Sequence, residues 1–284
     1  MSMAVTEHPG FTLADAWQRL GVTMGTVANN RSLIWELAKR ELRERHAGSL
    51  LGSTWIVLLP LAQLAIYAVV FTQIFKVKLG GTADMPLGYT TYLFAGLLPW
   101  LAIADGLIRN SISMTANANL VKQVVFPIEL LPLKSSIAAV TLQVVSTGIA
   151  MVFILLNEHT LPLTVALLPV AIALELGMLV GVGWILAVIG VFVRDLKEII
   201  QVALGILVYC IPAFYTAEAV PGALRIPVLL NPFTHIIYVF QDVMYYGRIG
   251  HPLSWVIAAG ITATALLVGN SFFQRCKPHL GSML

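Results

Sequence analysis

The sequence predicts an all-α membrane protein with six transmembrane helices. Of its 284 residues, 58% are hydrophobic and only 11% are charged, whereas a soluble domain carries about 25% charged residues. Its apolar runs exceed the ~18 residues at which a bilayer span becomes the default interpretation. The first long run begins only at Trp55, after polar or mixed sequence, so we expect no signal peptide at the start.

The six spans are expected near residues 55–75, 89–108, 135–156, 162–193, 199–215 and 253–273. The third contains no charged residue, and the fourth contains only Glu175. The fourth exceeds the ~20 residues needed to cross a bilayer, so we expect it to tilt or to protrude. Residues 49–284 would form the transmembrane domain, after an unassigned segment 1–30 and an amphipathic interface helix at 31–48.

The distribution of Lys and Arg predicts that both termini face the cytoplasm. Thirteen of the 17 basic residues lie before the first expected span, between the second and third, after the fourth, or in the tail. Basic residues stay on the cytoplasmic side of such proteins. The longest segment expected on the opposite side, 216–252, has short apolar pieces broken by Pro221, Pro227 and Pro232. Two short re-entrant helices would account for it, since irregular backbone at membrane depth must be surrounded by protein; a plain external loop is the alternative.

Residues 31–46 carry an amphipathic pattern. Ile34, Leu37, Ala38 and Leu42 recur at helical spacing, and four cations lie mostly elsewhere. A basic amphipathic helix suits the cytoplasmic interface, with its apolar face among the lipid headgroups. It is either a simple topogenic anchor or a segment whose cations also meet an anionic substrate headgroup or a cytosolic partner. Those candidate entrance cations are Lys39, Arg40, Arg43 and Arg45.

Residues 117–133 form a short and largely apolar cytoplasmic segment. Leu120, Val121, Val124, Val125 and Phe126 precede Pro127, whereas a solvated loop would be more polar. Such a segment indicates either insertion into a groove on a partner protein or a helix lying on the lipid surface.

Aromatic residues cluster toward the expected outer side. An interfacial aromatic belt explains most of them. A sugar polymer in a channel would also favour aromatic faces, and the candidates for such a channel are Tyr67, Phe71, Tyr92 and Trp100. The sequence does not separate these two interpretations.

No catalytic or metal-binding motif is present in the sequence. There is no GxxxxGK[ST], GxSxG, HExxH or CxxC pattern, so we expect no ATP hydrolysis by this chain and no metal. The net charge of +3 is too small to suggest nucleic acid, and Cys210 and Cys276 are expected to be unpaired. Asp105 and Glu175 are the charges within spans, and such charges are functional candidates by default. For Glu175 the alternatives are a substrate role and a structural polar contact between helices, and for Asp105 the alternative is a side chain that simply reaches the interface.

Four segments in this order resemble ABC-2-type permeases that export bacterial surface polysaccharides such as O-antigen, capsule or teichoic acid. The first is residues 40–75, where a basic helix runs into Ser49, Leu51, Gly52, Trp55 and Pro60. The others are the coupling region 117–133, the turn 190–200 with Arg194 and Asp195, and the outer pieces 211–215 and 229–237 with Asn231 and Pro232. One departure is Gln241, where members of this family often carry Arg.

The resemblance implies a homodimer in the bacterial inner membrane, paired with two copies of a separate ABC nucleotide-binding subunit that binds ATP and Mg. The cargo would be a lipid-linked polysaccharide, most specifically O-antigen. The implied ATPase-coupling residues are Asn119, Leu120, Lys122, Gln123, Phe126, Pro127 and Glu129. An ABC-2 exporter of a small drug or lipid fits the same features, and a secondary transporter is the alternative from another class. A secondary transporter predicts inverted repeats and charged broken helices, and the sequence displays neither.

Overall fold

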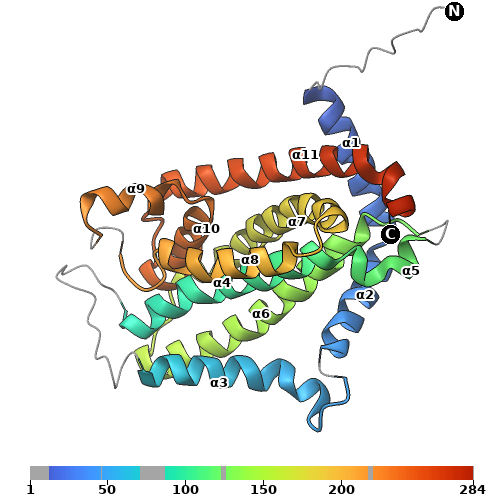
Figure 1. The fold of residues 1–284 in the computed structure, drawn as a ribbon. Coiled ribbons are helices and arrows are strands. Elements are labelled where there is room, and N and C mark those ends of the chain that lie inside the picture. Colours follow the sequence, from blue (N-terminus) through green and yellow to red (C-terminus); the bar gives the residue numbers. More distant parts are fainter. Residues whose placement is uncertain (1–12, 46, 71–86, 123–125, 217–219, 284) are drawn as a thin grey trace, which may run out of the picture.

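The computed structural model describes residues 13–45, 47–70, 87–122, 126–216 and 220–283, and it is helical throughout with no strand in those ranges (Figure 1). Residues 1–12, Phe71 and Gln123 lie outside the described residues. Two helices precede the first long apolar helix: α1 (Leu13–Asn29) and α2 (Arg31–Glu44). Segment 1–30, which was left unassigned in the sequence prediction, therefore contains a helix.

Within the described ranges, five helical segments are long and apolar enough to cross a membrane. They contain α3 (Trp55–Val69), α4 (Tyr89–Ile112), α6 (Leu130–Glu158), α7 (Leu168–Phe192) and α11 (Pro252–Met283). These five coincide with five of the six expected spans. The fourth covers Leu163–Phe192, close to the expected 162–193, because a 3₁₀ turn, Leu163–Leu167, leads into α7.

The remaining expected span, 199–215, is shorter in the structure than predicted. It corresponds to α8 (Leu196–Leu207), which has 12 residues, and to a three-residue 3₁₀ turn, Val208–Cys210. Residues 211–215 are not helical. At 1.5 Å per residue α8 is about 18 Å long, so it falls short of a hydrocarbon core about 30 Å thick.

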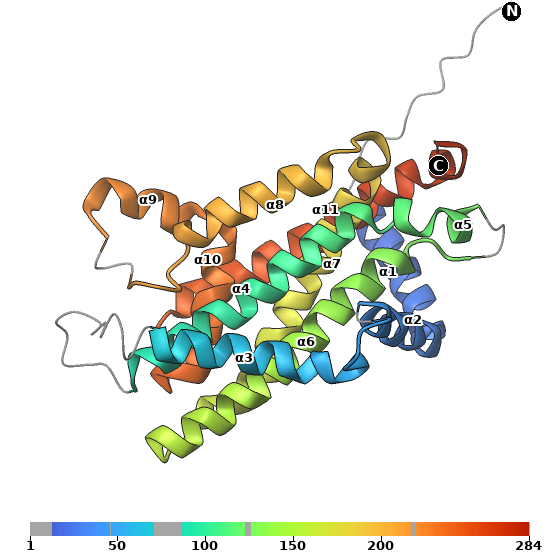
Figure 2. The same cartoon turned by 60° about the horizontal axis from the view of Figure 1, so that its bottom comes forward.

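The helix α4 lies at the centre of the bundle, and α3 lies at its edge (Figure 2). In α4, 78% of the most apolar stretch of 18 residues is buried. In the segment that contains α3, only 6% of the corresponding stretch is buried. The main core gathers around Leu93, Ile103, Leu179, Ile237 and Phe240, from α4, α7 and α10. The outer side of α3 is therefore left to lipid or to another protein.

The helices α7 and α11 cross at glycines. A Cβ atom at Gly181 would overlap the backbone of Ala265, and one at Gly269 would overlap the backbone of Gly181. Small residues let helix backbones approach closely, which is a common way of packing helices within membranes. These two glycines therefore fix how closely the last helix packs on the centre of the bundle.

Two short helices, α9 (Gly222–Leu230) and α10 (Pro232–Gln241), lie at the end of the bundle opposite α1 and α2 (Figure 1). The start of α10 follows from its sequence. The Asn231 side chain accepts a hydrogen bond of 3.1 Å from the Phe233 amide, and Pro232 occupies the first turn, where no amide donor is needed. The following π-helical turn, Asp242–Tyr246, is buried except at its last residue. The sequence predicted two short helices in this region, and the structure contains them.

Candidate functional site at the end that holds α2 and α5

The short helix α5 (Ala118–Val121) lies at the same end of the bundle as α1, α2 and the C-terminus (Figures 1 and 2). This end carries the segments that the sequence marked for function. A groove of about 480 Å³ separates α2 from the turn that leads into α5. It is lined by Leu37, Arg40, Glu41 and Glu44 on one side, and by residues 115–120 and Lys134 on the other.

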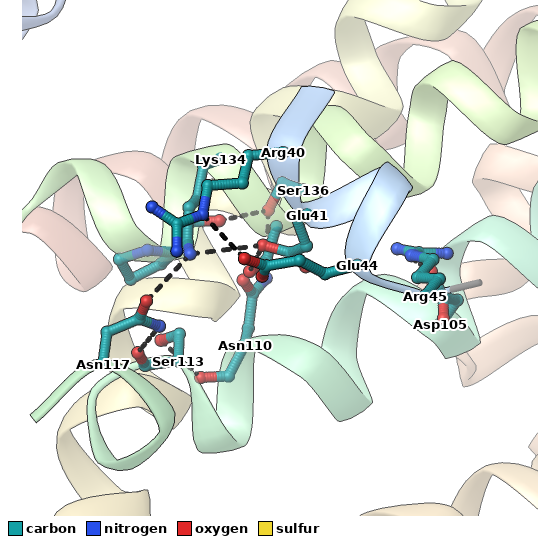
Figure 3. A network of polar contacts seen from close by, with 12 residues as sticks. Arg40, Glu41, Glu44, Arg45, Asp105, Asn110, Ser113, Asn117, Lys134 and Ser136 are labelled. Atoms are coloured by element: carbon teal, nitrogen blue, oxygen red, sulfur yellow. Dashed lines mark hydrogen bonds and ion pairs between the residues drawn. The ribbon is translucent and has the colours of Figure 1, made fainter. Parts of the chain in front are cut away.

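A buried ion pair joins α2 to α6 at the bottom of this groove (Figure 3). The Lys134 Nζ atom lies 3.6 Å from Glu41 Oε2, and Ser135 Oγ donates a hydrogen bond of 3.0 Å to the same oxygen. The Lys134 side chain is 9% exposed and that of Glu41 is 13% exposed. The pair is thus removed from most of the solvent, where an ion pair needs further hydrogen bonds to be favourable.

The same lysine also reaches the turn before α5 (Figure 3). Lys134 Nζ donates a hydrogen bond of 3.0 Å to Asn117 Oδ1, and Asn117 Nδ2 donates one of 2.7 Å to the Ser113 carbonyl. A continuous polar chain therefore links α2, the start of α6, the turn before α5 and the end of α4.

A second ion cluster fixes the end of α2. Arg45 Nη2 lies 2.9 Å from Asp105 Oδ2, and Arg109 Nε lies 2.8 Å from Asp105 Oδ1. Burial lowers the pKa of the Arg45 guanidinium, and the Asp105 carboxylate acts against that shift. An arginine remains protonated in proteins nonetheless, so this cluster holds two positive charges and one negative charge.

The four expected entrance cations are not gathered at one place. Lys39 and Arg40 pair with Glu36 and Glu44 of their own helix. Arg43 is exposed, whereas Arg45 is buried against Asp105. Moreover, Ile34, Ala38 and Leu42 are buried, and Ile34 packs in one cluster with Leu130 and Trp184. Part of the face expected among lipid headgroups therefore packs on protein.

The expected coupling residues divide into an exposed and a buried group. Asn119 and Lys122 are exposed, and Leu120, Phe126 and Pro127 are half-buried. Leu120 and Phe126 pack against the cluster around Leu130 and Trp184. Val121, expected to reach a partner, is buried in this chain.

Glu129, also expected to act in coupling, is occupied within the chain. Its carboxylate lies 2.8 Å from Lys277 Nζ, and its carbonyl accepts a hydrogen bond of 3.1 Å from Trp184 Nε1. The end of the coupling segment is thereby tied to α7 and to α11.

The expected channel aromatics that the structure describes lie among the helices. Tyr92 and Trp100 are buried. The Tyr92 hydroxyl lies 2.8 Å from the carbonyl oxygens of both Pro212 and Tyr215, and Trp100 packs edge-on against Phe233. Tyr67 is half-buried and accepts a hydrogen bond of 3.1 Å from Gln63. Tyr92 and Trp100 hold α4 to the segment 211–233.

Sequence analysis missed the partners that organise this end of the bundle: Glu41, Asn117, Asp105 as a partner of Arg45, and Lys277. Most of these interactions join residues far apart in the chain, such as Glu41 and Ser135, which are 94 positions apart, and Glu129 and Lys277, which are 148 positions apart. The available signal was the presence of acidic residues inside basic segments. That signal identifies charged residues but not the residues with which they pair.

Five long apolar helical segments and a charged, hydrogen-bonded end define a multi-pass membrane protein. Residues 32–245 match the family model described as ABC-2 type transporter. The chain therefore belongs to the ABC-2 type transporter family, which confirms the family that the sequence resembled.

Proteins named O-antigen export system permease protein RfbA are similar to this chain over most of its length. One from Klebsiella pneumoniae is 26% identical over 254 residues, which cover 89% of this chain and 95% of the relative. Another from Myxococcus xanthus is 24% identical over 256 residues, which cover 89% of this chain and 96% of the relative. A second Klebsiella pneumoniae protein is 24% identical over 256 residues.

Proposed function

We propose that the chain is the transmembrane subunit of an ATP-driven exporter that moves a lipid-linked polysaccharide, most specifically O-antigen, from the cytoplasm across the bacterial inner membrane. The observation that carries this proposal is the similarity along 89% of the chain to proteins named as permeases of O-antigen export. The alignments also cover nearly the whole of those relatives, so no large part of their architecture lacks a counterpart here.

The working unit in this proposal is a homodimer with two copies of a separate nucleotide-binding subunit. That subunit would bind ATP and Mg, and this chain would contribute no catalytic residue. The family membership supports a permease role. The apolar outer side of α3, where Val57, Leu61 and Ile66 are exposed, offers surface for a second copy or for lipid.

In this proposal α8 makes the sixth crossing, and both termini face the cytoplasm. The helix is too short to span by itself, so the segment beyond it must be surrounded by protein at membrane depth. The burial of Ile236, Ile237 and Phe240 in α10 supports a re-entrant position for α10.

We infer that the nucleotide-binding subunit contacts α5 and the groove between α5 and α2. The exposed Asn119 and Lys122 would supply contacts. Because Lys134 bonds both Asn117 and Glu41, a displacement of α5 would be transmitted to α2. Motion of the ATPase would in this way reach the segment proposed to lie at the substrate entrance.

Co-purification tests the proposal most directly. The chain is expressed with the ATPase encoded beside it, the complex is reconstituted, and its stoichiometry, ATP hydrolysis and polysaccharide export are measured. We expect two copies of each chain and export that requires ATP. A chain that binds no ATPase and moves solute down an ion gradient would refute the exporter function, while an active complex that moves only small amphiphiles would refute the cargo.

A matched pair of variants tests the coupling contact. Asn119→Arg should weaken ATPase binding about tenfold or more, because a bulky charge enters the interface, whereas Asn157→Arg should not. Both asparagines are exposed, and Asn157 lies at the end of α6 away from α5. Phe126→Asp should also dissociate the ATPase, but its ring packs on the core, so the surface variant is the cleaner test. Equal binding by both asparagine variants would contradict this contact.

The entrance role is tested with Lys39, Arg40 and Arg43 changed together to Gln. We expect loss of export with the complex intact, because an anionic substrate headgroup needs charge-assisted donors. Arg45 is left unchanged because it forms a buried ion pair. The control changes Glu36 and Glu44 to Gln, which removes the partners of two of these cations but keeps the positive charge. Unchanged export by the triple variant would remove the entrance role.

A further inference from the structure

We propose that the cavity between α3, α4 and α6 binds one anionic phospholipid of the surrounding membrane, with its phosphate at Arg45 and Arg109 and one acyl chain along α3. This inference concerns a resident lipid and does not depend on which cargo the protein moves. It rests on the shape of the cavity, on the charge at one end and on the apolar wall that continues from it.

The cavity has a volume of about 330 Å³, within the range of small-molecule sites. Its walls come from the first half of α3, the middle of α4 and the middle of α6, with Arg45, Asp105 and Arg109 at one end. It exists because the only buried residue of α3 is Leu64, which packs on Phe94, Leu98 and Ala150. The earlier turns of α3 stand away from the bundle.

The charged end of the cavity has an excess of positive charge and an unused donor. Two guanidinium groups share the single carboxylate of Asp105. The Arg45 side chain is only 8% exposed, yet its Nε atom has no hydrogen-bond partner among the described residues. Buried polar groups are nearly always paired, so this donor points to a missing acceptor. A phosphate oxygen would supply both that acceptor and the balancing negative charge.

The other walls match a hydrocarbon chain and not a free anion. Ile56, Leu59, Leu98 and Leu101 line the cavity beyond the charges. A smaller cavity of about 20 Å³ shares Pro60, Gln63, Leu98, Leu101 and Ser146 with it and reaches Tyr67 and Phe94. A mostly apolar path, with the polar side chains of Gln63, Gln143 and Ser146 along it, therefore runs along α3 from the arginines, as a lipid with its headgroup at the membrane surface requires.

The charged end also lies at the correct level for a headgroup. Arg45 directly follows α2, seven residues before the first apolar segment starts at Gly52. Arg109 lies in the last turn of α4. Basic residues at helix ends meet lipid phosphates at the interface, so one ligand can contact both the arginines and the apolar wall.

Native mass spectrometry of the purified full chain tests the proposal with phosphatidylglycerol and phosphatidylcholine of identical acyl chains as probes. We expect one phosphatidylglycerol to remain bound per chain, about tenfold more tightly than phosphatidylcholine. Arg109→Gln should abolish this preference while keeping the Arg45–Asp105 pair, and Leu59→Trp should weaken both lipids by filling the cavity from the exposed helix α3. Arg31→Gln, an exposed arginine at the start of α2, is the matched control and should bind as the unchanged protein does.

Three outcomes would overturn the proposal. The first is equal binding of the two lipids, since the arginines would then have no role. The second is an unchanged preference in Arg109→Gln or unchanged binding in Leu59→Trp. The third is retention of undecaprenyl phosphate but not of phosphatidylglycerol, because the occupant would then be a carrier lipid of the cargo.

Discussion

The ion pair between Glu41 and Lys134 contributes to the stability of the end of the bundle that holds α2. Removing a charge from water costs several kcal/mol, which only a partner and further hydrogen bonds offset. Lys134 has Glu41 and Asn117 as partners, and Glu41 also accepts from Ser135. By contrast, Arg40 and Glu44 are both largely exposed, where an ion pair contributes little. We therefore expect the attachment of α2 to the bundle to depend on the pair of Glu41 and Lys134 and not on the pair of Arg40 and Glu44.

Glu41→Gln should lower the free energy of unfolding by about 2–3 kcal/mol, because it leaves the buried Lys134 ammonium without its countercharge. Combining it with Lys134→Met should recover part of that loss, since no buried charge is then unpaired. Thermal unfolding midpoints of the single and double variants in detergent measure this. Glu44→Gln is the matched control, with an expected change within about 0.5 kcal/mol. Equal destabilisation by Glu41→Gln and Glu44→Gln would show that the buried pair has no special weight.

Among the helices, length and apolarity determined what could be predicted from sequence. The five long helices were placed correctly because each contains an apolar run that suffices by itself. The helix α8 was overestimated because the apolar run continues through residues 208–215, although the helix is interrupted there and the chain is held by contacts from Tyr92 and Gln241 to the Pro212 carbonyl. The helix α1 does carry a local signal, since the buried Ala16, Leu20 and Thr23 recur at helical spacing, but it was left unassigned. The pairing of Glu41 with Lys134 has no local signal, because it joins distant residues.

Gln241 illustrates how such a contact changes the interpretation of a residue. The resemblance in the sequence led us to expect a basic residue at this position. In the structure Gln241 is buried in α10 and its Nε2 atom donates a hydrogen bond of 2.6 Å to the Pro212 carbonyl. A neutral amide is thus suited to an enclosed backbone acceptor, where an unpaired arginine would be costly. The role of this residue is to hold α10 to the segment after α8.

The glycine crossing of α7 and α11 yields a prediction at the level of the element. Gly181→Val or Gly269→Val should prevent normal packing of the two helices, because each new side chain would overlap backbone of the other helix. We expect a large fall in the yield of folded protein and in the midpoint temperature of thermal unfolding, because such overpacking is strongly destabilising. Gly260→Ala in α11 is the control, since a Cβ there meets nothing within 4 Å. A folded and stable Gly269→Val variant would contradict the close crossing.

At the scale of the whole molecule, contacts between the two ends of the chain bear on its topology. Thr23 Oγ1 in α1 donates a hydrogen bond of 2.8 Å to Asn270 Oδ1 in α11, and Gln274 Nε2 donates one of 3.0 Å to Thr23. The helix α1 precedes every apolar segment, and residues 270–274 lie near the end of the last one. A contact at the bundle end between α1 and the last apolar helix supports the proposed even number of crossings. In that proposal the short helix α8 makes the sixth crossing.

Cysteine labelling measures this topology. After Cys210 and Cys276 are changed to Ser, single cysteines are placed at the exposed positions Ser32, Arg248 and Met283. In sealed right-side-out vesicles, a membrane-impermeant maleimide should label Arg248→Cys alone, and Ser32→Cys and Met283→Cys should react only after the vesicles are opened. We expect residue 248 on the outer side because α8 and the protein-covered α10 together complete the crossing that α8 is too short to make alone. Labelling of Ser32→Cys and Met283→Cys from opposite sides would instead establish five crossings, and the contact between α1 and α11 would then be wrong.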